Sequence, residues 1–158
     1  MRLGVEATAF LQTGCAIVVG TLGPDGAPHA SRGWGLSAES LDPETLRLLV
    51  SADDPTTISH LAAGGAVAVT GADVRTLYSI QVKGHASALE PATDEDRVRA
   101  ARFSDEFFTA VVETDGVDRR LLERLVPRDY VACTLTVEEL YDQTPGPGAG
   151  APIAPPGS

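Results

Sequence analysis

The sequence predicts a mainly β (α+β) domain in which six antiparallel strands close into a small barrel with flanking helices. Apolar, β-branched runs recur along the chain between turn signals, which is the pattern of strands. A Pro24-Asp-Gly26 turn joins the first two runs into a hairpin, and a pair of helical patterns precedes the last run. Closing six strands into a barrel leaves no exposed strand edge.

The chain begins with a short helix and the hairpin. Residues 4–12 are weakly amphipathic, and we predict a helix that covers one end of the sheet. Residues 15–22 are apolar and β-branched, and we predict a strand that is buried on both faces. In the turn, Pro24 presets φ for the first corner, and Gly26 takes the left-handed conformation that closes the hairpin.

The second strand of the hairpin, residues 28–36, is the first candidate for the wall of a site. It places Arg32 and Trp34 among small residues that include Ser31 and Gly33. Glycines weaken a strand and often mark a place where a ligand or another backbone approaches closely. This strand is therefore predicted to face a ligand.

A third strand is predicted at residues 46–51, and a helix follows it with Asp54 as N-cap and Pro55 at the first helical position. The free N–H groups and the positive dipole end of a helix start suit an anion, so the turn from Asp54 to Thr57 is a candidate phosphate site. The alternative is an ordinary capped helix, and Asp53 and Asp54 would repel an anion.

The fourth and fifth strands are predicted at residues 66–71 and 77–90, the fifth with a bend at Gly84. Gln81 and Lys83 alternate with apolar neighbours, so one face of the fifth strand is apolar and the other presents an amide and an ammonium. The pattern fits a strand that faces a ligand, and it fits an exposed edge strand as well.

Two helices and a sixth strand complete the predicted fold. Thr93 and Asp96 form a capping box at the start of the longer helix. Its apolar stripe, expected to pack on the sheet or to form a dimer contact, consists of Val98, Ala101, Phe103, Phe107, Phe108, Val111 and Val112. The second helix is expected to bury Val117, Leu121, Leu122 and Leu125. The sixth strand is predicted at residues 129–137.

Length and composition limit the classes of function. A chain of 158 residues fits one domain, placed at residues 1–144, and the Pro/Gly/Ala-rich residues 145–158 form a tail that is either disordered or laid along another surface. The net charge of −10 repels a phosphate backbone, so no nucleic-acid partner is expected. No apolar run reaches the roughly 18 to 20 residues of a membrane span, and the N-terminus lacks a signal-peptide pattern. We expect a cytoplasmic protein.

Cysteines and histidines show no metal-binding or nucleophilic pattern. Cys15 and Cys133 lie far apart in apolar runs, which predicts buried thiols in a reducing compartment. His29, His60 and His85 fall in separate predicted elements, without metal-ligand spacing. No metal site and no catalytic acid or base is predicted.

The order of these elements resembles the pyridoxamine 5'-phosphate oxidase-like, FMN-binding split-barrel family, over about residues 5 to 145. The resemblance rests on Phe10-Leu11 through Ile17-Val-Val19, the Pro24-Asp-Gly26-Ala-Pro28 turn, Arg32-Gly-Trp34, the Thr56 to Leu61 helix and Tyr78-Ser-Ile-Gln-Val-Lys-Gly84. The C-terminal run from Tyr141 to Gly150 is similar to the ending of an uncharacterised branch of the family. The fold that the resemblance implies is a six-stranded antiparallel split β-barrel of the Greek-key type.

The resemblance also implies a homodimer that holds one FMN in each of two clefts between subunits. Carried over by position, the residues expected to flank the flavin from the second strand are Ser31, Arg32 and Gly33. Those expected to approach the phosphate are Ser51, Thr56 and Thr57. Those expected to face the ring or the phosphate from the fifth strand are Gln81 and Lys83. Trp34 or the segment from Tyr141 to Thr144 is expected to cover the ring, the latter from the same or the partner chain.

The chain departs from the oxidases where they grip phosphate. Their Ser-Arg-Lys triplet corresponds here to Pro55-Thr56-Thr57, which has no positive charge, and Gln81 stands where they have an arginine. Arg32 lies one residue further from its proline, which turns a strand side chain to the opposite face. Each charge-assisted contact to phosphate contributes about 1.5 to 3 kcal/mol. We therefore expect a substrate other than pyridoxamine phosphate.

These observations lead to one hypothesis and three alternatives. The first is an FMN-binding oxidoreductase acting on an unknown small molecule, in which the protein orients the flavin and tunes its electronics. The alternatives are an F420-dependent reductase on the same fold, a non-catalytic flavin- or haem-binding barrel with a histidine as axial ligand, and a dimeric barrel without a cofactor.

Overall fold

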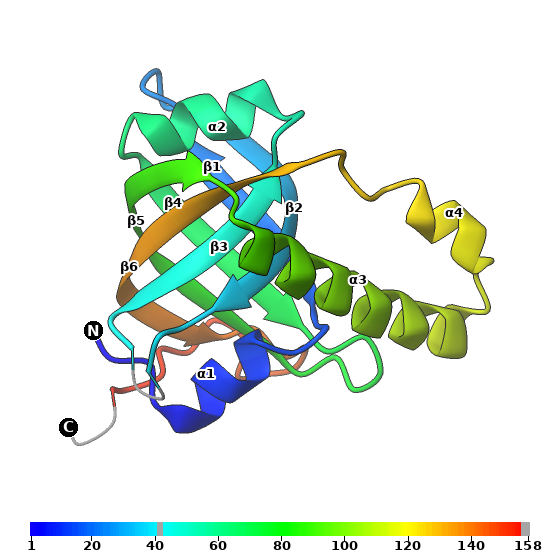
Figure 1. The fold of residues 1–158 in the computed structure, drawn as a ribbon. Coiled ribbons are helices and arrows are strands. Elements are labelled where there is room, and N and C mark those ends of the chain that lie inside the picture. The colour runs from blue at the N-terminus through cyan, green and yellow to red at the C-terminus, as the bar shows by residue number, and fades with distance from the viewer. Residues whose placement is uncertain (41–42, 156–158) are drawn as a thin grey trace.

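The computed structural model describes residues 1–40 and 43–155. Its centre is a closed antiparallel barrel with the strand order β1-β2-β3-β6-β5-β4 (Figure 1). The strands are β1 (Ala16–Leu22), β2 (Pro28–Ser37), β3 (Thr45–Ser51), β4 (Ala66–Ala72), β5 (Ser79–Pro91) and β6 (Tyr130–Asp142). The predicted six-stranded antiparallel barrel with flanking helices is confirmed.

The β1–β2 hairpin has the predicted turn but a different burial of its first strand. Gly26 has a φ of 80°, and its N–H donates to the Gly23 carbonyl at 2.9 Å. Burial alternates along β1, where Val18 is 53% exposed and Leu22 is 43% exposed. The prediction that this strand is buried on both faces is therefore wrong. Every strand of a closed barrel has one face toward the interior and one toward the outside.

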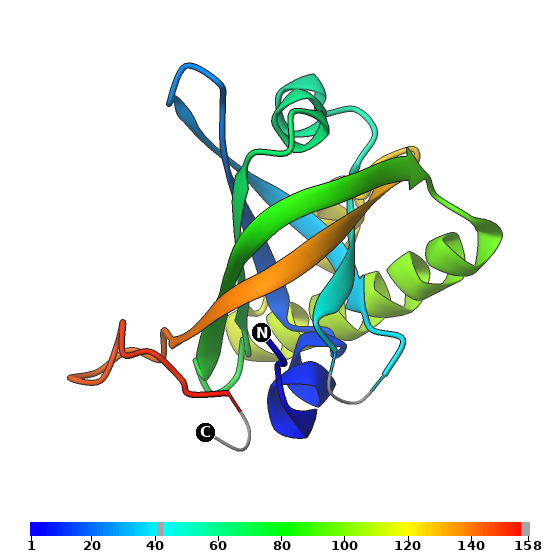
Figure 2. The ribbon, with the colours of Figure 1, turned by 90° about the vertical axis from the view of Figure 1, so that its left-hand side faces the viewer.

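Two helices close the ends of the barrel, α1 (Val5–Leu11) at one end and α2 (Pro55–Ala62) at the other (Figures 1 and 2). The lid helix predicted at residues 4–12 is confirmed. At α2, the Asp54 carboxylate accepts from the Thr57 N–H, and Pro55 opens the helix as predicted. Both helices are short, and each buries a leucine against the barrel, Leu11 from α1 and Leu61 from α2.

The β5–β6 pair is the longest in the barrel and carries the predicted bend as a β-bulge. The register shifts between Lys83 and Gly84. A Cβ at Gly84 would lie 1.8 Å from the Thr136 carbonyl oxygen, so this strand crossing requires glycine. The strand β6 continues to Asp142, beyond the end predicted at residue 137, because β5 stays paired with it over that length.

The tail returns along the end of β6 as far as it is described. The Ile153 N–H donates to the Leu140 carbonyl at 2.8 Å, and the Asp142 N–H donates to the Ala151 carbonyl at 2.9 Å. The tail was predicted to be either disordered or laid along another surface. Its described part lies along the end of β6, which is the second alternative.

The long helix α3 (Asp94–Asp115) crosses outside β2 (Figure 1). Thr93 and Asp96 form the predicted capping box. Phe103 and Phe108 are buried as expected, but Val98 is 69% exposed. The prediction that the apolar stripe packs on the sheet is therefore wrong at Val98 and at Ala101, which is also exposed. A helix that crosses a curved barrel touches it along a narrow line, so a wide apolar stripe is only partly covered.

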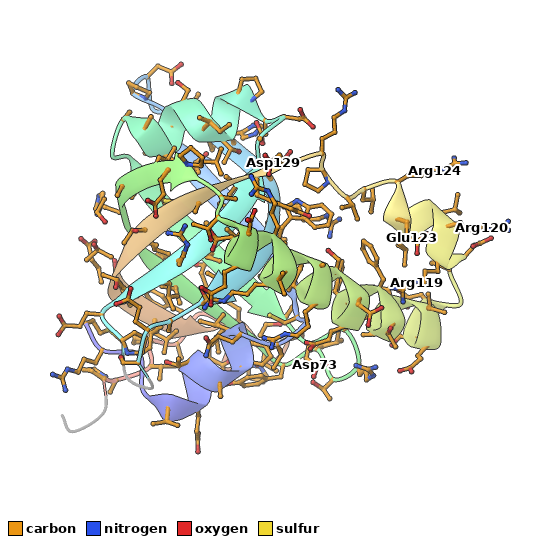
Figure 3. All side chains as sticks on the ribbon, in the orientation of Figure 1. Asp73, Arg119, Arg120, Glu123, Arg124 and Asp129 are labelled. Carbon is orange, nitrogen blue, oxygen red and sulfur yellow. The ribbon has the colours of Figure 1, made fainter. Side chains whose placement is uncertain are left out.

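Helix α4 (Arg119–Glu123) buries only part of the face that was predicted. Leu121 is 54% exposed and Leu125 is 48% exposed. The helix projects beyond the barrel, with Arg120 and Arg124 pointing away from it (Figure 3). The Arg119 side chain donates to Asp105 at 2.6 Å and to Thr109 at 3.2 Å on α3, and Leu122 packs against the hydrophobic core, so polar contacts and partial packing together place this arm.

The barrel interior and the contact with α3 form one hydrophobic core. Its fully buried members include Ile17, Val69 and Leu135. Cys15 and Cys133 are buried free thiols, as predicted, and burial raises the pKa of each to about 11. In the described part of the chain, no helix is both long and apolar enough to cross a bilayer.

Candidate functional site

The predicted phosphate-binding residues lie at the end of the barrel beneath α2. Thr57 is fully buried, and its hydroxyl oxygen lies 2.9 Å from that of Ser31 on β2. The Ser51 hydroxyl at the end of β3 accepts from the Asp53 N–H at 3.1 Å. Thr56 is exposed on the first turn of α2. Sequence segments that are far apart thus meet at this corner.

Asp54 occupies the start of α2. Its carboxylate accepts from the Thr57 N–H at 3.0 Å and from the Thr57 hydroxyl at 2.6 Å, and it lies 3.3 Å from the His29 ring. Burial opposes ionisation of this carboxyl group, but the bonds from Thr57 and His29 outweigh it and lower the pKa of Asp54. The group is a carboxylate at neutral pH.

This corner therefore has the wrong charge for a phosphate dianion. Of the N–H groups that a helix start offers to an anion, that of Thr57 donates to the protein's own carboxylate on Asp54, and Pro55 has none to offer. No lysine or arginine occurs between residues 48 and 74. Two negative charges placed beside Asp54 would have no counter-charge from this segment.

The other polar candidates lie on the outside of the barrel wall. In the register, Arg32 on β2 pairs with Val18, Val18 pairs with Thr70, and Thr70 pairs with Gln81 on β5. Residues directly opposite one another in antiparallel strands point to the same face. Arg32 and Gln81 therefore belong to one row, in which the Gln81 amide donates to the Thr70 hydroxyl at 2.8 Å.

The neighbouring row consists mainly of small residues. Gly20 on β1 pairs with Ala30 and with Ala68, and Ala68 pairs with Lys83. These residues line an open groove of about 620 Å³, which we call the outer groove. Its full lining is Gly20, Thr21, Leu22, Pro28, His29, Ala30, Ala66, Val67, Ala68, Lys83, Gly84, His85, Glu138 and Glu139. The volume lies within the range of small-molecule sites.

Arg32 and Lys83 differ from most basic residues of this acidic protein. Among the described residues, eight arginines contact a carboxylate within 4.0 Å, and neither of these two side chains does. Instead the Arg32 guanidinium carbon lies 5.6 Å from the centre of the Phe107 ring, and the Lys83 ammonium lies 4.4 Å from that of Tyr141. Both cations remain available to an anionic ligand.

Gly33 and Trp34, also predicted at the site, are part of the core. A Cβ at Gly33 would lie 2.3 Å from the Ile17 side chain, so internal packing accounts for this glycine. Trp34 is 3% exposed, and its ring lies 6.5 Å from that of Phe108 and 6.4 Å from that of Tyr130. A cofactor contact by Trp34 would require this part of the core to repack.

The family model described as pyridoxamine 5'-phosphate oxidase matches residues 3–143. The chain belongs to the pyridoxamine 5'-phosphate oxidase family. The match covers all six strands and α1 to α4, so the family assignment includes both the outer groove and the corner beneath α2.

Solved structures agree with the fold. An F420 reductase aligns with a TM-score of 0.54 and 16% identity, over 84% of this chain and 93% of its own. A putative pyridoxamine 5'-phosphate oxidase from Lactobacillus delbrueckii has a TM-score of 0.55 and 16% identity, over 89% and 93%. HupZ from Group A Streptococcus has a TM-score of 0.56 and 14% identity, over 94% and 100%. No curated protein matches the sequence. At these identities the likeness establishes the fold alone.

For a flavin, which the family resemblance implies, this member of the pyridoxamine 5'-phosphate oxidase family provides a partial fit. The small residues of the outer groove allow a flat ring to approach the wall. Lys83 lines the groove together with the carboxylates of Glu138 and Glu139, and Arg32 and Gln81 lie in the adjacent row, where they offer further N–H donors. The corner beneath α2 does not fit a phosphate dianion. Within residues 1–40 and 43–155, no group of three or more His, Cys, Asp or Glu side chains is arranged to hold a metal ion.

Sequence reasoning missed the small residues of the groove and Thr70. A signal for them was present, because Gly20 alternates with buried Val19 and Thr21, and Ala68 alternates with buried Val67 and Val69. Sequence reasoning found Arg32 and Lys83 because they are charged. The small residues between them, which it missed, determine the shape of the ligand that can bind.

Proposed function

We propose that this protein is a flavin-dependent oxidoreductase that binds FMN against its outer groove and acts on a small molecule. The observation that carries the proposal is the pair of cations, Arg32 and Lys83, which contact no carboxylate of the described residues and stand on the β2 and β5 sides of a surface of small side chains. When bound, a flavin supplies hydride and electron transfer, while the protein supplies orientation and electrostatics.

Each polar residue of the wall has a distinct part in this proposal. Three inter-strand spacings of about 4.8 Å separate β2 from β5, so Arg32 and Gln81 lie roughly 14 Å apart along the wall. This span suits a ring at one end and a negatively charged group at the other. The Gln81 amide is oriented by its bond to Thr70, which leaves its carbonyl oxygen as an acceptor. Arg32 and Lys83 would stabilise negative charge on the phosphate or on the reduced ring.

The proposal includes a homodimer in which a second copy covers the outer wall. Val18 and Leu22 are apolar and exposed beside the groove. Contiguous apolar surface of this kind marks interaction sites, and a two-fold axis lets the same wall serve both copies. Covering the groove would also exclude water, which strengthens the interactions of Arg32 and Lys83 with an anion. Two buried, free thiols are consistent with a cytoplasmic location.

Cofactor binding tests the proposal directly. The purified protein is expected to absorb at about 450 nm, as oxidised flavin does. Arg32→Ala and Lys83→Ala are each expected to raise the Kd for FMN by about tenfold or more, since each removes a charge-assisted contact. Fluorescence titration of FMN measures this, with Arg120→Ala on α4 as the matched control. Unchanged affinity in both groove variants would refute the placement.

The oligomeric state gives a second test. Ala68→Arg introduces a long charged side chain in the middle of the outer groove, and we expect it to convert the dimer to a monomer in sedimentation velocity. Ala101→Arg, on the exposed side of α3, makes the same chemical change away from the wall and should leave the dimer intact. A wild-type protein that sediments as a monomer, or an Ala68→Arg variant that stays dimeric, contradicts the proposed interface.

F420 is the second candidate because of the charge beneath α2. The carboxylate of Asp54 and the lack of lysine or arginine in residues 48–74 disfavour a phosphate dianion at that corner. A deazaflavin whose phosphate is a singly charged diester would meet less repulsion at that corner than a phosphate dianion would. A single absorption band at about 420 nm, in place of the flavin bands, would identify this alternative.

Haem is the less favoured alternative because each histidine ring already contacts a side chain. His29 contacts Asp54, the His60 ring lies 2.9 Å from the Thr21 hydroxyl, and His85 contacts Glu138. An axial ligand would have to give up its contact. A sharp Soret band in the purified protein would overturn this ranking.

A further inference from the structure

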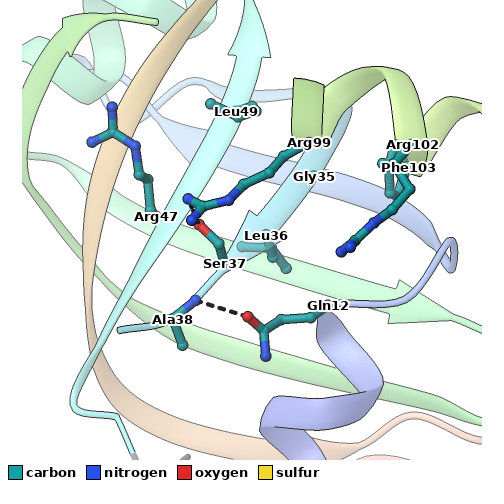
Figure 4. A pocket seen from close by; sticks show the side chains of 10 residues that line it. All are labelled: Gln12, Gly35, Leu36, Ser37, Ala38, Arg47, Leu49, Arg99, Arg102 and Phe103. Carbon is teal, nitrogen blue, oxygen red and sulfur yellow. Dashed lines mark hydrogen bonds between the residues drawn. The ribbon is translucent and has the colours of Figure 1, made fainter. Parts of the chain in front are cut away.

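A small pocket opens between the first half of α3 and the end of β2, far along the strand from the outer groove (Figure 4). Its cavity volume is about 70 Å³, with room for roughly five atoms. We call it the arginine pocket. It is lined by Gln12, Gly35, Leu36, Ser37, Ala38, Arg47, Leu49, Arg99, Arg102 and Phe103.

The charged groups of this lining are all cationic. Arg47 is already engaged, since it donates two bonds to Asp96 and one to Glu90, and its guanidinium points away from the other two (Figure 4). Arg99 donates to the Ser37 hydroxyl at 3.3 Å while it also pairs with Glu95.

Arg102 is the least engaged of the three arginines. Its nearest carboxylate, on Glu106, lies 3.7 Å away, which is beyond hydrogen-bond distance. Its side chain donates no hydrogen bond to any described residue, although it extends to the same side of α3 as Arg99 (Figure 4). The lining thus offers guanidinium donors to an anion and includes no carboxylate, while Glu95 and Glu106, the partners of Arg99 and Arg102, lie outside it.

Neutral donors and apolar walls complete the pocket. The Gln12 side-chain oxygen accepts from the Ala38 N–H at 3.1 Å. This bond does not use the NH₂ group of Gln12, which can donate to a ligand. Leu36, Leu49 and Phe103 supply apolar surface. A phosphate would leave such walls unused, whereas a carboxylate with a short hydrocarbon chain would contact both kinds of surface.

The backbone explains why these groups converge. The β2–β3 register shifts between Gly33 and Leu36, and Gly35 has a φ of 142°, which glycine adopts readily. The resulting bulge opens the strand below α3. Arg99 and Arg102 are three residues apart on that helix, so their side chains emerge on the same side.

We propose that the arginine pocket binds a small organic carboxylate, with Arg99, Arg102 and Ser37 holding the carboxylate and Leu36, Leu49 and Phe103 contacting a chain of a few carbons. The pocket shares no residue with the outer groove. The proposal therefore stands whether or not the protein binds a flavin.

Ligand titration of the full-length protein, followed by ¹H–¹⁵N NMR, tests the proposal with propionate, propionamide and inorganic phosphate as probes. Propionate is expected to give saturable shifts at Ser37, Ala38 and Arg102. Propionamide has the same shape without the charge and is expected to bind at least tenfold more weakly, because charge-assisted bonds to guanidinium groups are lost. Phosphate is expected to bind more weakly than propionate.

Two variants locate the site. Arg102→Gln is expected to weaken propionate binding about five- to tenfold, since one exposed charge-assisted contact is removed. Ser37→Ala should weaken it less, about threefold, because a neutral hydroxyl contributes less. Arg120→Gln on α4 serves as the matched control and should bind like the wild type.

Three outcomes overturn the proposal. The first is no saturable binding of propionate to the wild type. The second is equal binding of propionate and propionamide, or tighter binding of phosphate. The third is unchanged propionate affinity in both Arg102→Gln and Ser37→Ala. Because Arg102 is exposed and bonded only weakly, its variant is expected to keep the fold, which the dispersion of the same NMR spectra verifies.

Discussion

Replacing Asp96 with alanine is expected to lower the free energy of unfolding by about 3 to 5 kcal/mol, the range for breaking one side of a buried ion pair. Asp96 is 1% exposed and accepts two bonds from Arg47 on β3, at 2.8 and 2.6 Å. It also accepts from the Thr93 N–H at 2.8 Å in the capping box. Without the carboxylate, Arg47 stays half-buried with only Glu90 as a counter-charge. Urea unfolding followed by circular dichroism measures the change.

The control for this variant is Glu95→Ala, one residue earlier on α3. Glu95 forms an exposed pair with Arg99, and such pairs contribute about 0 to 1 kcal/mol. If the two variants lose the same small amount of stability, the Arg47–Asp96 pair does not hold α3 to the barrel.

The Arg47–Asp96 pair also makes the free energy of unfolding depend on pH in the acid range. The bonds from Arg47 and Thr93 hold the pKa of Asp96 well below its usual range, even though burial opposes this. Because the folded-state value is the lower one, the contribution of Asp96 is complete above the unfolded value of about 3.9 and is lost as pH falls further. We expect the stability of Asp96→Ala to fall less steeply with decreasing pH than that of the wild type. Acid unfolding followed by circular dichroism between pH 2 and 7 measures this.

Gly84→Ala is expected to be at least as damaging, with a loss of about 4 kcal/mol or more or a failure to fold. A Cβ at this position would lie 1.8 Å from the Thr136 carbonyl oxygen and 2.9 Å from its carbon. Both atoms belong to the backbone, so no side-chain rotation relieves the overlap. Separating β5 from β6 at the bulge would break the longest pairing of the barrel. Thermal unfolding and the soluble yield report the effect.

Gly20→Ala is the matched control, because it makes the same change in another strand of the same barrel. The atoms nearest to a Cβ there are the Ala68 carbonyl oxygen at 3.7 Å and the Ala68 Cβ at 3.9 Å, which are ordinary contacts. We expect a change of less than about 1 kcal/mol. Equal stability of the two alanine variants would mean that the β5–β6 crossing is looser than the structure shows.

Local signals in the sequence were reliable where the interaction itself is local. The capping residues Asp54 and Thr93, the turn at Gly26 and the strand positions all depend on neighbours within a few residues. The bend at Gly84 was also anticipated, although its cause, the backbone of Thr136, lies some fifty residues away.

The errors arose where burial depends on distant parts of the chain. Apolar composition predicted that the first strand and the second helix are buried. The structure exposes Val18 on the outside of the barrel and Leu121 on the arm. Apolar residues that a monomer leaves uncovered look the same in a sequence as those it buries, because hydrophobicity does not encode which surface will meet them.

The candidate site divides in the same way. Alternation along β5 is enough to place Gln81 and Lys83 on one face of that strand. That Arg32 shares this outward side follows from the barrel register, and that Ser31 meets Thr57 instead follows from the docking of α2. The assignment of Trp34 to the core required the position of Phe108 on α3.

The sequence by itself determined the strands, their turns, the helix caps, the acidic charge and the family resemblance, since these depend on short-range patterning and residue order. Only the tertiary structure decided which polar residues share a surface, that Asp54 fills the start of α2, and that Arg99 and Arg102 converge on an open pocket. Those facts depend on strand register and helix docking, which bring together residues separated by tens of positions.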